Sequence, residues 1–135
     1  MKHGIISAPQ PEAVEAGALT LRAGGNAIDA GIACALTQGV VDPLMCGLGG
    51  VGTATVHVPS AGGPENFNFL GTAPQAARAD MWESRIVGET GDGFGFILEG
   101  NVNALGHQAA MTPGNLAGYW AMHQAYGKLP WADLC

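Results

Sequence analysis

Residues 23–53 constrain the fold most, because they read as a turn, a buried helix, a stop and a glycine-lined loop. The turn at 24–26, Gly-Gly-Asn, accepts positive φ easily, so a preceding helix can end there and the chain can reverse. Residues 27–40 are nearly all small or apolar, and a helix that is apolar on most of its faces is buried among other elements. Asp42 and Pro43 favour extended or turn geometry, which stops this helix directly before them.

The loop after this helix contains Gly47, Gly49 and Gly52, which spell the G-x-G-x-x-G of dinucleotide-binding proteins. That fingerprint requires a strand before the glycines and a helix after them. Here a helix precedes the glycines, and residues 53–58 alternate like a strand. The order disfavours a nucleotide-binding module, which stays a rival hypothesis that binding of NAD or ATP would support.

Hydrophobic periodicity and turn residues predict the remaining elements. We expect a buried strand over 4–8, helices over 12–22 and 116–126, strands over 51–58 and 66–70, a short helix over 80–86 and a strand over 106–112. The Pro- and Gly-rich segment 59–64 predicts that the two central strands form an antiparallel hairpin with a loose loop. Residues 88–106 carry six glycines and predict an irregular surface loop. Gly127 is expected to close the last helix, and Pro130 to begin another.

Charge and composition limit the partners. Only 12% of the residues are charged and 47% are apolar, which is typical of a piece that packs against more protein. The net charge is −6 with no Lys/Arg cluster, so nucleic acid and anionic membranes are not expected as partners. No apolar run approaches the roughly 18 to 20 residues of a membrane span. Three cysteines cannot all pair internally, which favours the reducing cytoplasm.

No catalytic constellation is visible in the chain. The histidines lie far apart and no HxxxH or CxxC spacing occurs, so we expect no metal and no cofactor. No serine lies in a Gly-x-Ser-x-Gly elbow. Asp29 lies within the apolar helix, where an ionised carboxylate must find hydrogen bonds. We expect it to bond backbone amides of a nearby turn rather than to act in catalysis.

Several motifs together resemble one known family. The start of the large subunit of γ-glutamyltransferases carries similar motifs in the same order. In this chain they are APQPEAVEAG at 8–17, GGNAIDA at 24–30, a V-x-P before the glycine run, Ala73-Pro74 and TPGNLAGYWAMHQAYGKLPW at 112–131. The γ-glutamyltransferases are N-terminal-nucleophile hydrolases made as one precursor. The resemblance covers most of the chain.

The resemblance implies that residues 1–135 are the N-terminal fragment of a large subunit, with no internal domain boundary. The fold class is then α/β of the α+β type, as part of an α-β-β-α sandwich. Partners would be the small subunit of the same precursor and a small-molecule amide. The nucleophile would be a threonine outside this chain, whose own α-amine serves as base. The fragment alone is therefore expected to contain no catalytic residue and to be inactive.

The resemblance also places Leu70 and Gly71 in the substrate-binding position. Relatives usually read Phe-Arg-Glu-x-Ala-Pro, and the arginine grips the α-carboxylate of the glutamyl group. This chain reads Phe-Leu-Gly-Thr-Ala-Pro over 69–74. Leucine cannot pair a carboxylate, so either another group such as Arg78 reaches in, or the substrate is a non-glutamyl amide. An amidohydrolase and a non-catalytic scaffold are therefore the alternatives to a γ-glutamyltransferase.

Overall fold

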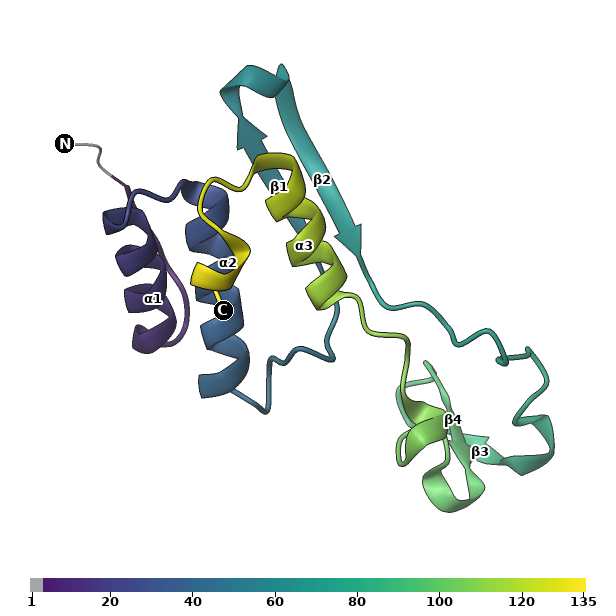
Figure 1. The fold of residues 1–135 in the computed structure, drawn as a ribbon. Helices are drawn as coiled ribbons and strands as arrows, with labels where there is room; N and C mark the ends of the chain where they lie inside the picture. The colour runs from purple at the N-terminus through teal and green to yellow at the C-terminus, as the bar shows by residue number, and fades with distance from the viewer. Residues whose placement is uncertain (1–3) are drawn as a thin grey trace. The chain divides into compact units, whose positions relative to one another are not determined.

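The computed structural model describes residues 4–135 (Figure 1). Three α-helices and two antiparallel hairpins make up its regular structure: α1 (Pro11–Arg22), α2 (Ala27–Val41), β1 (Gly52–Val58), β2 (Gly63–Phe69), β3 (Ile86–Glu89), β4 (Phe96–Leu98) and α3 (Asn115–Tyr126). This mixture confirms the α+β class. No helix within residues 4–135 has both the length and the apolar composition needed to cross a membrane.

The contacts divide the chain into two compact units. Unit 1 comprises the residues up to Gly71 together with Pro113–Cys135, and unit 2 comprises Thr72–Thr112. Unit 1 contains all three α-helices and the β1–β2 hairpin, and unit 2 contains β3 and β4. The expectation of a single piece without an internal domain boundary stays a prediction.

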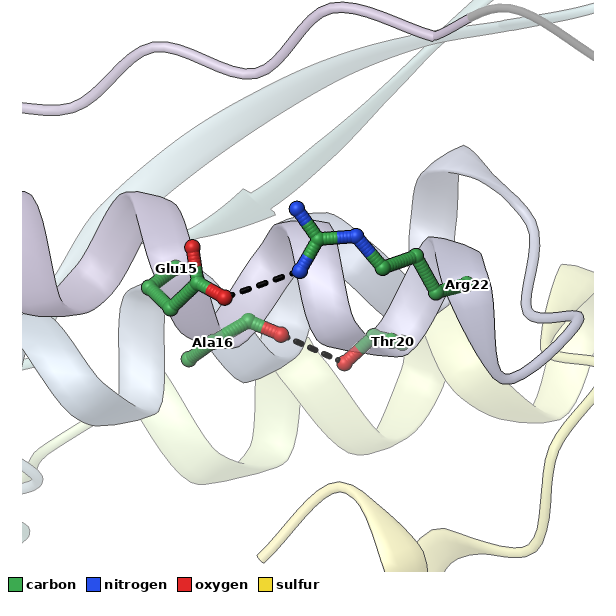
Figure 2. A network of polar contacts seen from close by, with 4 residues as sticks. All are labelled: Glu15, Ala16, Thr20 and Arg22. Atoms are coloured by element: carbon green, nitrogen blue, oxygen red, sulfur yellow. Dashed lines mark hydrogen bonds and ion pairs between the residues drawn. The ribbon is translucent and has the colours of Figure 1, made fainter.

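Helix α1 begins with Pro11, whose fixed φ suits the first turn, and carries Glu12 near its N-terminus. Figure 2 shows two side-chain contacts along the helix. Arg22 Nη1 lies 2.8 Å from Glu15 Oε1, and Thr20 Oγ1 donates to the carbonyl of Ala16 at 2.9 Å. The ion pair is mostly exposed, so it adds little to stability. The predicted helix over 12–22 is confirmed.

The turn between α1 and α2 forms as its residues predicted. Gly24 has a φ of 95°, and a Cβ on Gly25 would lie 2.9 Å from the carbonyl oxygen of Thr20. Asn26 then caps α2 with its side chain, which accepts from the backbone of Ile28 and Asp29. Helix α2 ends at Val41, directly before the predicted stop.

The core of unit 1 lies between α2, α3 and the β1–β2 hairpin. Its buried members come from distant parts of the chain: Ile32, Val56, Met122 and Leu134. Helix α2 also contacts α1 on another side, which explains why nearly all of its faces are apolar (Figure 1). The predicted hairpin is confirmed, with Val56 opposite Glu65. Its loop is tighter than expected, because Pro59–Ala61 form a 3-10 turn that ends in Gly62 at a φ of 82°.

The predicted strand over 4–8 is wrong. These residues form no strand, and Ile5 is 99% exposed. The apolar run packs through Ile6 instead, because a Cβ on Gly17 of α1 would overlap Ile6 Cδ1. A short apolar run indicates burial but does not identify the partner.

Most other differences between the predicted and the observed elements lie in unit 2. The predicted irregular loop over 88–106 contains strand β4 and part of β3, joined by a turn in which the hydroxyl of Thr90 accepts from the Gly95 amide at 3.0 Å. The predicted helix over 80–86 is only a 3-10 turn at Glu83–Arg85. The predicted strand over 106–112 is wrong as well, because it forms a 3-10 turn and a single bridge between Thr112 and Thr72.

Helix α3 begins at Asn115, one residue before the prediction, and ends at Tyr126. Gly127 follows it as expected but has a φ of −63° and a ψ of 150°, which is not the left-handed cap geometry. Glycine is needed there for space, since a Cβ would overlap the ring of His123. The helix expected at Pro130 is a 3-10 turn over Trp131–Asp133.

Candidate functional site

The predicted substrate-binding residues, Leu70 and Gly71, directly follow β2. The Leu70 amide donates to Asn68 Oδ1 at 3.1 Å, and Leu70 itself is 55% exposed. Its side chain is therefore free of the core of unit 1. Their role in binding substrate stays a prediction, because their position in the fold does not reveal a ligand.

Phe69 anchors this segment to α3. Its ring lies edge-on to that of Tyr119, with the centroids 5.7 Å apart. A Cβ on Gly114 would overlap the carbonyl oxygen of Phe69, and a Cβ on Gly118 would overlap its ring. Two glycines of the TPGNLAGYW motif thus allow β2 to approach the helix closely, which fixes the position at which Leu70 leaves the sheet.

The glycine loop over 47–52 contacts the start of α3. The carbonyl of Gly50 accepts from the amides of Gly114 at 3.0 Å and Asn115 at 3.1 Å. Asn115 Nδ2 donates to the carbonyl of Gly47 at 2.7 Å. A Cβ on Gly50 would lie 2.6 Å from that nitrogen, so the loop needs glycine here for packing. Helix α2 precedes the loop and β1 follows it, so the order required for a dinucleotide fingerprint is absent.

Asp29 is fully buried, and its carboxylate is bonded only to backbone amides. It accepts from Asn26 at 2.9 Å, which completes a capping box with the Asn26 side chain. It also accepts from the amides of Lys128 at 2.9 Å and Leu129 at 3.3 Å. The prediction of a structural carboxylate bonded to a turn is confirmed.

The same contact has further members, and we call the whole set the Asn26–Asp29 clasp. Asn26 Nδ2 donates to the carbonyl of Tyr126 at 2.6 Å, and Lys128 Nζ donates to the carbonyl of Gly24 at 2.6 Å. The clasp joins the α1–α2 turn to the end of α3, about a hundred residues later. The sequence did not lead us to predict that Asp29 bonds to the segment after α3. The signal was present, because both segments belong to motifs of the same family resemblance.

The titratable groups give no sign of an activated nucleophile among residues 4–135. Burial raises the pKa of the Cys34 thiol, which lowers its thiolate fraction. The pKa of Tyr119 is raised by burial and, to a smaller extent, by the neighbouring charge of Cys46. His123 Nε2 donates to the carbonyl of Leu129 at 2.8 Å, and its ring stacks on Trp120. Within the same residues, no three His, Cys, Asp or Glu side chains gather where they could hold a metal ion.

Comparisons with known proteins agree on one family. The family model described as "Gamma-glutamyltranspeptidase" matches residues 13–135. The chain is 35% identical to a glutathione hydrolase proenzyme of Pseudomonas aeruginosa over 97% of its length and 22% of that protein. It is 36% identical to an acylase ACY 1 proenzyme of Pseudomonas sp. strain V22, over 98% of this chain and 23% of that protein.

Comparison of the fold with solved structures points to the same family. The solved structure of the γ-glutamyltranspeptidase from Pseudomonas nitroreducens, complexed with L-DON, aligns with a TM-score of 0.82 at 33% identity. The alignment covers 99% of this chain and 37% of that one. The chain spans about a fifth of the length of the two curated relatives named above.

Proposed function

Because this chain belongs to the γ-glutamyltranspeptidase family, we propose that it forms part of an enzyme that transfers or hydrolyses γ-glutamyl groups of glutathione-type substrates. The observation that carries the proposal is the match of nearly the whole chain to this family in sequence, together with its fold. In this proposal α1, α2, α3 and the β1–β2 hairpin contribute part of an α-β-β-α sandwich.

The chemistry would take place on a threonine outside residues 1–135, freed by self-cleavage at the start of a small subunit. The threonine Oγ would attack the amide carbon while its α-amine takes the proton. The C–N bond would then break, the proton would pass to the leaving amine, and an ester would remain on the threonine. Water or an acceptor amine would attack this ester and release the acyl group. The proposed partners are that small subunit and a small amide in the cytoplasm, not nucleic acid or a membrane.

Residues 69–71 would form one wall of the acyl pocket in this enzyme. Leu70 stands where relatives usually have the arginine that grips the α-carboxylate, and Gly71 stands where they have glutamate. This departure favours a second candidate, an amidohydrolase of a non-glutamyl small amide. The match to a protein named an acylase supports that branch. A non-catalytic scaffold is the third reading, and a complete chain that never cleaves itself would support it.

The substitution Leu70→Arg separates the first two candidates in the complete gene product. We would compare kcat/KM for a γ-glutamyl anilide and for the butyryl anilide, which lacks the α-amine and α-carboxylate. A new arginine–carboxylate pair is worth on the order of 1.5 to 3 kcal/mol, so the γ-glutamyl preference should rise at least tenfold. Leu70→Gln is the matched control, because it adds polarity without the charged fork.

The change in substrate preference shows whether position 70 lines the acyl pocket. A selective gain with Leu70→Arg alone would place position 70 against the α-carboxylate. If both variants leave the ratio of the two rates unchanged, Leu70 does not line the acyl pocket. If the unsubstituted enzyme already prefers the butyryl anilide, the amidohydrolase is the correct candidate.

A further inference from the structure

Unit 2 contains a hollow of about 660 Å³ between residues 73–85 and residues 107–111. Its walls are mostly apolar, with alanines around Pro74, Met81, Trp82 and Met111. The volume lies in the range of small-molecule pockets, roughly 300 to 1,000 Å³. We call it the Trp82 hollow.

The ionisable side chains that line the Trp82 hollow are all basic. Arg78, Arg85 and His107 belong to its lining, and no aspartate or glutamate does. The whole chain has only five Lys and Arg residues against eleven Asp and Glu, so two arginines in one hollow depart from its acidic character. The hollow therefore gathers basic side chains on a chain that is acidic as a whole.

Both guanidinium groups can take a further anionic partner. Arg78 contacts Asp80 through Nε at 3.4 Å, and three quarters of its side chain is exposed, which leaves both terminal nitrogens free of that contact. Arg85 forms no ion pair among residues 4–135. Arginine presents its donors as a planar fork that matches a carboxylate with two parallel hydrogen bonds.

The indole of Trp82 supplies a third feature. Its Nε1 is buried and has no acceptor among the described residues. A buried donor without a partner costs on the order of 1 to 3 kcal/mol. A small turn of the ring toward an oxygen in the hollow would remove this cost. The ring also offers an apolar face against which a flat group can stack.

From these features we propose that the Trp82 hollow binds a small organic carboxylate with a flat apolar body. The carboxylate is held by Arg85 and Arg78, and the body lies against Trp82 and the methionines. The apolar walls favour such a ligand over inorganic phosphate or a sugar phosphate, whose surfaces are polar throughout. The inference stands on unit 2 alone and does not depend on the proposed amide chemistry.

Calorimetric titration of the complete protein with hippurate tests the site, because this probe carries a benzoyl group and one carboxylate. Hippuramide has the same body without the charge, and inorganic phosphate has the charge without the body. We expect hippurate to bind at least tenfold more tightly than either, and its affinity to fall as salt rises. Equal binding of hippurate and hippuramide would overturn the proposal, as would phosphate binding as tightly as hippurate, or no binding of hippurate.

Two variants locate the binding. Arg85→Gln should weaken hippurate at least fivefold, and Trp82→Phe should weaken it about fivefold, because it removes the indole N–H whose missing hydrogen bond the ligand would supply. Arg22→Gln is the matched control, because this arginine lies on α1 of unit 1, and it should leave the affinity unchanged. Circular dichroism of each variant shows whether it is folded. If folded Arg85→Gln binds as the parent does, or if Arg22→Gln weakens binding equally, the hollow is not the site.

Discussion

Unit 1 and unit 2 are stabilised in different ways. In unit 1 the clasp and the core connect residues about a hundred positions apart, such as Asp29 with Lys128 and Ile32 with Met122. In unit 2 the clearest polar contacts span only a few residues, such as Thr90 with Gly95. Leu98 is the one member of unit 2 among the buried apolar residues of the described chain. Unit 1 is thus a packed scaffold, while unit 2 depends on local turns, which are typical of regions that open at low free energy.

Asp29→Ala is the substitution with the largest expected effect on stability, and it tests the long-range contacts of unit 1. The change leaves the backbone amides of Asn26, Lys128 and Leu129 without their shared acceptor. Each lost bond to a charged group costs on the order of 1.5 to 3 kcal/mol, so the free energy of unfolding should fall by about 3 kcal/mol or more. Urea unfolding followed by circular dichroism measures it. Asp133→Ala, at an exposed aspartate of the same unit, should change it by less than about 0.5 kcal/mol. Similar losses for both variants would mean that the clasp does not hold unit 1 together.

Two glycine-to-alanine substitutions compare a closely packed helix face of unit 1 with an open one. Gly118→Ala places a Cβ on the ring of Phe69, so it should destabilise unit 1 by about 1 to 3 kcal/mol. Gly31→Ala on α2 meets nothing within 4 Å, so it should stabilise by up to about 1 kcal/mol through helix propensity. Thermal unfolding of both variants gives the two signs. A Gly118→Ala variant that is as stable as the parent would contradict the close approach of β2 to α3.

Leu98→Ala should destabilise unit 2 selectively. The change removes the main buried side chain of that unit, at a cost near the lower end of the roughly 2 to 5 kcal/mol range for such substitutions. Hydrogen exchange should speed up for amides of β3 and β4 and remain unchanged for α2. Equal acceleration in both regions would show that the two units unfold together.

The smallest effect concerns the turn at Asp92. The Thr90 hydroxyl and the Phe94 amide both donate to this carboxylate, at 2.5 and 3.1 Å, and they lower its pKa below the usual 3.8. Because the pKa of Asp92 is lowered in the folded turn, its ionised carboxylate stabilises the turn above pH 3.8. This contribution disappears as the pH falls through the folded-state pKa. Asp92→Asn should therefore remove an acid-dependent chemical shift change at Gly95 in NMR spectra. If the parent shows no such change below pH 3.8, the turn is not held by this carboxylate.

The sequence predicts unit 1 better than unit 2 for a physical reason. Helices α1, α2 and α3 have long apolar patterns with clear stops, so local rules suffice. Strands β3 and β4 span four and three residues in a glycine-rich segment, and such short pieces carry no readable period. The pairing of Asp29 with Lys128 also could not be read locally, because its donors come from a turn that only the tertiary fold brings near.

The candidate site was predicted only in part. The motif identified residues 69–71, and the structure adds that Phe69 is fixed against Gly114 and Gly118. No local signal marked the Trp82 hollow, since one wall comes from residues 73–85 and the other from residues 107–111, which only the fold brings together. The role of Leu70 stays a prediction that substrate profiles can test.

The most direct test of the family-based function is the intact mass of the complete gene product before and after overnight incubation. The account predicts two fragments, the smaller of which begins with threonine, and a Thr→Ala change at that residue should abolish the cleavage. A single uncleaved chain would contradict the proposed threonine chemistry, and would leave residues 1–135 as a scaffold with the family fold.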